Sequence, residues 1–240
     1  MRRCHLFLLL ALLVASACSS SHADEHLLII DLNRTTTIPL TLQRVSTTPT
    51  PAQIISANSF GAYVVNTDTL STDIYVASWD SLTYIPLFIQ RGVSQRVCGV
   101  MHNDSLTHVS FSDLETQTLS RIEDIRRRLA LQTDTILAHS DLRSPKTRVL
   151  AADTLLSLRQ SFRREALECL AVADTSIVAI PLLRLPIFDP SADFAIYKRV
   201  AENLIIRHLR NDLVAHFVAD VRTLSDTLSK KEKQSLLPRK

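Results

Sequence analysis

The chain has 240 residues, a formal net charge of +3 and only three glycines, all of them in its first half. So few glycines disfavour the glycine-rich loops that bind nucleotide phosphates, and the low net charge gives no reason to expect a nucleic-acid partner. The length suits one large domain or two small ones.

The N-terminal segment has the pattern of an export signal. Arg2 and Arg3 are basic, an apolar run from Leu6 to Val14 follows, and Ala15-Ser16-Ala17 comes directly before Cys18. The apolar run is shorter than the about 20 residues that a membrane-spanning helix needs. Small residues followed by a cysteine resemble a bacterial lipobox, which predicts cleavage after Ala17 and attachment of a lipid to Cys18.

An alternative stays open, because Ala15 stands where the lipobox pattern prefers Leu. Cleavage by the ordinary signal peptidase would instead give a secreted protein with a spare cysteine. Lipidation is favoured, and its acyl chains would hold the protein firmly in a lipid bilayer. We therefore expect a signal peptide at 1–17 and a polar tether at 18–26. Removal of 1–17 lowers Lys plus Arg from 27 to 25 against 24 acidic residues, a net charge of +1.

Residues 27–112 have the composition of a mostly antiparallel β-sheet. Short runs rich in Thr, Val, Ile, Tyr and Phe alternate with turn residues. Pro86 cannot donate to a strand ladder, which predicts an edge strand or a bulge, and Gly92 is expected to form a turn. The predicted strands are Leu27–Leu32, Ile38–Val45, Gly61–Val65, Asp73–Ser78, Thr83–Gln90, Gln95–Gly99 and Thr107–Phe111.

Residues 113–235 change to the apolar period of helices. Ser112 and Glu115 have the spacing of a capping box, Pro145 suits the first position of a second helix, and Asp189-Pro190 predicts the start of a third. Asn211-Asp212 predicts a break and a new cap. The predicted helices are 112–138, 144–173, 189–208 and one from 212, with 177–185 as either a short kinked helix or a buried crossover.

The sequence therefore predicts an α+β fold, an antiparallel sheet followed by a layer of four to five helices. The predicted β-rich domain is 27–112 and the predicted helical region is 113–235.

Two cysteines stay available for chemistry after loss of Cys4 and lipidation of Cys18, namely Cys98 and Cys169. They have no Cys-x-x-Cys spacing and no neighbouring His or Lys that would favour a thiolate, so a thioredoxin-type catalyst is not predicted. Two buried, inert thiols are favoured, and one long-range disulfide between them is the alternative.

Other polar patterns are weaker candidates. His208, Asp212 and His216 would share a helix face and could ligate a metal only if one helix ran through all three. The predicted break at Asn211-Asp212 argues against that, so no metal and no cofactor is predicted. The motif His102-Asn103-Asp104-Ser105 is better explained as a turn than as half of an acid/base site.

Three groups of side chains could form contact surfaces. Arg126-Arg127-Arg128 and Arg163-Arg164 could face anionic lipid headgroups, but solvated helix faces are favoured. Trp79, Tyr84 and Phe88 could form an aromatic contact surface, but ordinary core packing is favoured.

Several short motifs carry a family resemblance: Asp73-Ile74-Tyr75-Val76, the stretch from Asp80 to Gly92, Cys98-Gly99-Val100, Thr175–Ile180, Phe188-Asp189-Pro190 and Asp193-Phe194. Together they resemble the β-rich domain of unknown function, and the helical region after it, in certain Bacteroidota envelope lipoproteins. In that family a thioredoxin-like module with a Trp-Cys-x-x-Cys site follows. The resemblance covers about residues 55–225, and this sequence ends at Lys240 without such a module, so no catalytic residue is carried over.

These observations predict a lipid-anchored protein of the bacterial cell envelope, periplasmic or at the cell surface. Its expected role is a non-enzymatic binding or accessory module for another envelope protein, such as a separately encoded thiol-redox partner. The alternative is an envelope enzyme whose polar groups converge only in the folded chain.

Overall fold

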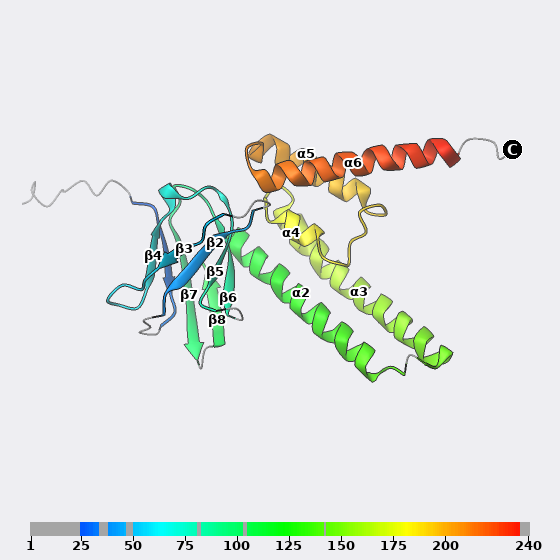
Figure 1. Cartoon of the computed structure of the whole chain (residues 1–240), viewed down its shortest axis with the longest axis horizontal. Helices are drawn as coiled ribbons and strands as arrows, with labels where there is room; N and C mark the ends of the chain where they lie inside the picture. Colours follow the sequence, from blue (N-terminus) through cyan, green and yellow to red (C-terminus); the bar gives the residue numbers. More distant parts are fainter. Residues whose placement is uncertain are drawn as a thin grey trace, which may run out of the picture.

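A computed structural model of the chain describes residues 25–33, 38–46, 50–80, 83–102, 105–141 and 143–235 (Figure 1). These residues form a β-rich half followed by a helical half, so the predicted α+β class is confirmed. The strands are β1 Leu27–Asp31, β2 Leu40–Arg44, β3 Gln53–Ile55, β4 Tyr63–Asn66, β5 Asp73–Ser78, β6 Tyr84–Ile89, β7 Gln95–His102 and β8 Ser105–Phe111. The helices are α2 Leu114–His139, α3 Pro145–Ala173, α4 Ala179–Leu183, α5 Phe194–His208 and α6 Asp212–Ser235.

The strands form two sheets in the described residues, where the sequence predicted a single sheet. Sheet A has the order β4-β1-β7-β8 and sheet B has the order β3-β2-β5-β6. All neighbouring strands run antiparallel except β1 and β7, which are parallel. The alternating pattern of a strand marks which side chains face the core, but it does not name the neighbouring strand. Strand β3 was missed because it is short and largely exposed.

The two sheets pack face to face around one apolar core. Alternate side chains of each strand point into it, as the period of two requires. Its members include Leu28 and Ile30 of sheet A and Tyr75, Leu87 and Ile89 of sheet B, all 5% exposed or less. This core belongs to the β-rich half alone.

The opposite face of sheet B packs against the helices. Ile74 of β5 and Phe88 of β6 join the helical core, while their chain neighbours Tyr75 and Leu87 point into the sandwich. Sheet B therefore lies between sheet A and helix α2, and Figure 1 shows α2 leaving the sheet with α3 beside it. Pro86 lies on β6 at the edge of sheet B, and Gly92 forms a turn at φ +71°, as predicted.

The first helix has a different cap from the predicted one. Asp113, and not Ser112, caps α2, because its Oδ1 accepts a hydrogen bond from the Thr116 amide at 2.6 Å. Ser112 instead accepts a hydrogen bond from the amide of Arg96 through its Oγ at 2.8 Å. The neighbouring strand thus decides which of the two polar residues caps the helix.

The third predicted helix begins later than expected. Asp189 caps a turn, because its Oδ1 accepts hydrogen bonds from the Ser191 and Ala192 amides, and α5 starts at Phe194 after Asp193. The apolar run before it contains the short helix α4, whose Ala179 and Ile180 are fully buried. The segment is thus both a short helix and a buried crossover.

Candidate functional site

A cleft of about 360 Å³ lies where the outer face of sheet B meets α2, α4 and the start of α6. Its floor consists of apolar side chains that are no more than 4% exposed: Ile74, Leu119, Ile122, Ile180 and Leu213. Half-buried Val76 and Pro86 line the side formed by the sheet. Its volume is at the small end of the range for ligand pockets, which are mostly apolar with a few polar groups.

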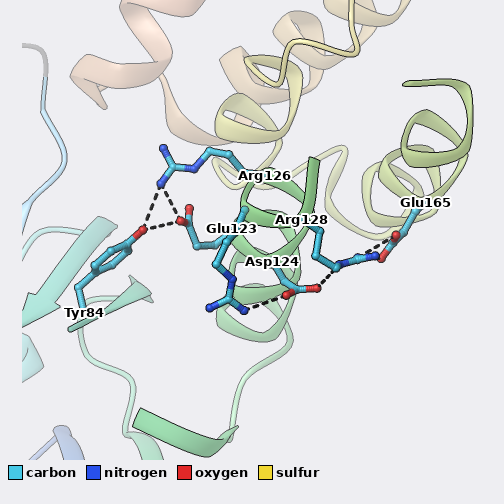
Figure 2. A network of polar contacts seen from close by, with 7 residues as sticks. Tyr84, Glu123, Asp124, Arg126, Arg128 and Glu165 are labelled. Carbon is cyan, nitrogen blue, oxygen red and sulfur yellow. Dashed lines mark hydrogen bonds and ion pairs between the residues drawn. The ribbon is translucent and has the colours of Figure 1, made fainter. Parts of the chain in front are cut away.

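Three polar side chains lie together at one side of this cleft (Figure 2). The hydroxyl of Tyr84 donates to Oε1 of Glu123 at 2.5 Å, and Nη2 of Arg126 donates to the same oxygen at 2.6 Å. Arg126 also donates to the Tyr84 hydroxyl at 3.2 Å. Burial, and next the hydrogen bond to Glu123, raise the pKa of Tyr84, so the phenol stays protonated at neutral pH.

A second groove, of about 550 Å³, lies across Tyr84 and Glu123 from the cleft, between β6, β8 and α2. Both strands lie at edges of their sheets, which is where an extended peptide could add as a further strand. The outer edge of β6 is closed to such pairing. Phe88 already bonds Thr116 through its amide and carbonyl and Gln95 through its carbonyl, and Pro86, two residues earlier on the same edge, has no amide hydrogen.

The predicted basic cluster of α2 is neutralised by neighbouring carboxylates. Arg126 pairs with Glu123, Arg127 pairs with Asp124, and Arg128 pairs with both Asp124 and Glu165 of α3. Figure 2 shows this row of charges crossing from α2 to α3. The pairs leave little net positive charge for lipid headgroups, which agrees with the favoured interpretation of a solvated helix face.

The two arginines of the second cluster point to different surroundings. Arg163 forms a two-pronged ion pair with Asp193 and donates to the Ile187 carbonyl at 3.2 Å. Its guanidinium also lies over the Phe188 ring, 5.2 Å from the ring centroid. Arg164 is exposed. The Arg163 hydrogen bonds hold the pKa of Asp193 below its ordinary value. Arg163 therefore fixes the segment between α4 and α5, part of which walls the cleft.

The predicted cysteine sites are placed as follows. Cys18 lies outside the described residues. Cys98 of β7 is half-buried, Cys169 of α3 is buried, and both are free thiols, so the disulfide alternative is not what the structure shows. Burial raises the pKa of Cys169, which disfavours its thiolate.

The other predicted residues do not converge. Helix α5 ends at His208 and α6 begins at Asp212, so the helix that a three-residue metal site would need is interrupted. Within the described ranges no three His, Cys, Asp or Glu side chains form a group that could hold a metal ion. His102 pairs with Ser105 across the β7–β8 hairpin, and Asn103-Asp104 lies outside the described residues.

The three aromatic residues lie in three separate surroundings. Trp79 donates to the Tyr63 hydroxyl at 3.0 Å beside the sandwich core, and Phe88 is buried in the helical core. Tyr84 lies at the cleft. Sequence reasoning missed the site because its lining comes from β5, β6, α2, α4 and α6; Pro86 on an edge strand was the one local signal.

No protein-family model, curated protein or solved structure matches this chain. None of the helices in the described residues has the combination of length and apolar character that crossing a membrane requires.

Proposed function

We propose that the protein is a lipid-anchored component of the bacterial cell envelope that acts as a non-enzymatic binding module. The anchor is the predicted lipid on Cys18, and the binding site is the cleft between sheet B and the helices. The resemblance to Bacteroidota envelope lipoproteins adds a separately encoded thiol-redox protein as the candidate partner. The cleft has an apolar floor and is open to solvent on one side, which suits an apolar group of the ligand.

The observation that carries this proposal is the cleft itself. Its floor leaves apolar side chains such as Ile122 and Ile180 next to a space of about 360 Å³ that no other part of the described chain fills. Filling such a space with an apolar ligand removes hydrocarbon surface from water, which contributes roughly 25 cal/mol per Å². The floor side chains are already no more than 4% exposed, so an apolar ligand would gain its binding energy mainly from covering its own surface and the half-buried Val76 and Pro86.

The alternative, an enzyme, receives less support from the polar groups of the cleft. A general acid or base needs a hydrogen bond to a substrate atom. Tyr84, Glu123 and Arg126 instead form hydrogen bonds with one another. The raised pKa of Tyr84 also keeps its phenol protonated at neutral pH, so it is not available as a general base. This arrangement favours a module that positions its ligand.

Binding is tested with a neutral fluorescent probe, N-phenyl-1-naphthylamine, whose emission rises in apolar surroundings. We expect saturable binding to the wild type and a loss of at least tenfold in affinity for Val76→Phe, because Val76 lines the cleft and a larger side chain fills it. The matched control is Val64→Phe on β4, an exposed position outside the cleft. Equal binding by both variants would contradict the proposal.

The anchor is tested separately by expressing the full chain and a Cys18→Ser variant in a bacterial host. The wild type should stay with the membrane fraction and have an intact mass that corresponds to residues 18–240 plus acyl chains and glycerol. The variant should lose the lipid mass and leave the membrane. A wild-type chain without lipid, cleaved elsewhere, would show that the anchor prediction is wrong.

A further inference from the structure

We propose that the ligand of the cleft is an anionic amphiphile, a single apolar chain that ends in one carboxylate, and that Arg184 binds its head. This inference rests on the proposed function, because it names the chemical class that the same cleft accepts. It follows from the position of Arg184 and from the charge around the cleft.

Arg184 lies directly after α4, at the rim of the cleft, and its side chain is exposed. Its amide is held by the Ile180 carbonyl, which fixes the backbone from which the guanidinium projects. Within the described part of the chain, the guanidinium has no carboxylate partner, in contrast to Arg126 and Arg163. A free guanidinium beside an apolar floor matches a carboxylate, which it can bind through two parallel hydrogen bonds.

The charge of the cleft favours an anion. The charged residues that line it are Glu123, Arg126 and Arg184, which give one net positive charge. Glu123 is already neutralised by Arg126 at 2.6 Å, so the surplus charge is that of Arg184. A carboxylate head would be attracted by this charge, whereas a cationic head would be repelled and a neutral head would gain nothing from it.

A neighbouring cavity provides an internal comparison. It has about 380 Å³, lies on the other side of the segment from Leu183 to Pro190, and is also lined by Arg184. The charged residues that line it are Arg184 and Asp220. That lining has one acidic and one basic residue, whereas the cleft against sheet B has one acidic and two basic residues, so the anionic head is assigned to the cleft against sheet B.

The test compares three ligands with the same ten-carbon chain, decanoate, decanol and decyltrimethylammonium, by calorimetric titration of the full chain at neutral pH. Decanoate should bind about fivefold more tightly than decanol, the size of effect expected for an exposed ion pair. Decyltrimethylammonium should bind more weakly than decanol. Arg184→Gln should abolish the preference, so that decanoate and decanol bind with equal affinity. Arg164→Gln, an exposed arginine outside the cleft, is the matched control.

The location is read independently by methyl NMR of the wild type, which requires no variant to fold. Decanoate should shift the methyl signals of Ile74, Ile122 and Ile180 and leave that of Ile30, in the sandwich core, unchanged. Shifts elsewhere would overturn the assignment to this cleft.

The outcomes separate this inference from the proposed function. If decanoate and decanol bind equally, or if Arg184→Gln has no effect, the assignment of an anionic head is overturned while the apolar cleft stands. If neither ligand binds and the neutral naphthylamine probe also fails, the proposed binding function is wrong as well. A preference for decanoate that Arg164→Gln removes equally would show non-specific attraction and would also overturn the role of Arg184.

Discussion

The two faces of sheet B belong to the same four strands but are covered differently. On the inner face, Ala77, Leu87 and Ile89 are covered completely by sheet A and are no more than 1% exposed. On the outer face, Ile74 and Phe88 are covered by helices, whereas Val76 and Pro86 lie beside the open cleft. One face is a closed core, and the other is partly a closed core and partly an open cleft.

The difference shows how a cleft arises from incomplete coverage. Sheet A matches sheet B in size and closes its inner face. The helices meet the outer face through α2 and the short buried helix α4, and where they diverge from the strands the apolar side chains keep a space beside them. The same alternation of residues therefore produces a stable interior and a candidate site.

The difference between the two faces is tested by truncating one side chain on each face and comparing the loss of stability. Leu87→Ala should lower the free energy of unfolding by about 3 kcal/mol, because it opens a cavity in a closed core. Val76→Ala should cost about 1 kcal/mol, because Val76 is half-buried beside a space that is already open. Urea unfolding of both variants measures the difference. Equal losses would mean that the two faces are equally closed.

The second prediction concerns the ion pair between Arg163 and Asp193, which fixes the segment between α4 and α5. Asp193 is 8% exposed and Arg163 is 32% exposed, so Asp193→Asn should cost about 2 kcal/mol at neutral pH, less than for a fully buried pair. The pKa of Asp193 is lowered in the folded state, so its contribution is present above the ordinary value of 3.8 and is lost as the pH falls through the lowered pKa. Wild type and variant should therefore converge in stability in acid.

That convergence is measured by urea unfolding at neutral pH and in stepwise more acidic buffers. Arg164→Gln is the control, since Arg164 lies next to Arg163 but is exposed. A constant gap between the wild type and Asp193→Asn at every pH would show that the carboxylate charge does not hold the segment.

The smallest expected effect is at Tyr197, on the helical side. Its hydroxyl donates to the Leu183 carbonyl at 2.6 Å, and Tyr197→Phe should cost about 1 kcal/mol. Burial, and next the nearby Asp193, raise the pKa of Tyr197 to about 12. This stabilisation is therefore present below pH 10 and is lost as the pH rises through about 12. Absorbance titration of the phenols should show a late transition that Tyr197→Phe removes and Tyr63→Phe retains.

Much of the fold could be predicted because its signals are local. Pro145 marks the start of α3, Ala173 its end, and Asp212 the start of α6, as the apolar period and the caps indicated. The choice between Ser112 and Asp113 as a cap could not be predicted, because it depends on a hydrogen bond from Arg96 on another strand. The late start of α5 likewise depends on how Asp189 and Asp193 share their hydrogen bonds.

The sequence by itself determined the α+β class, most strand and helix positions, and that the strand with Pro86 lies at an edge or has a bulge, because periodicity, caps and proline act within a few residues. Only the tertiary structure decided that there are two sheets in the described residues, that β1 and β7 run parallel, and that Arg184 stands free while Arg126 to Arg128 are paired. The cleft belongs to this second group, because its walls come from elements distant in sequence whose contacts no local pattern specifies.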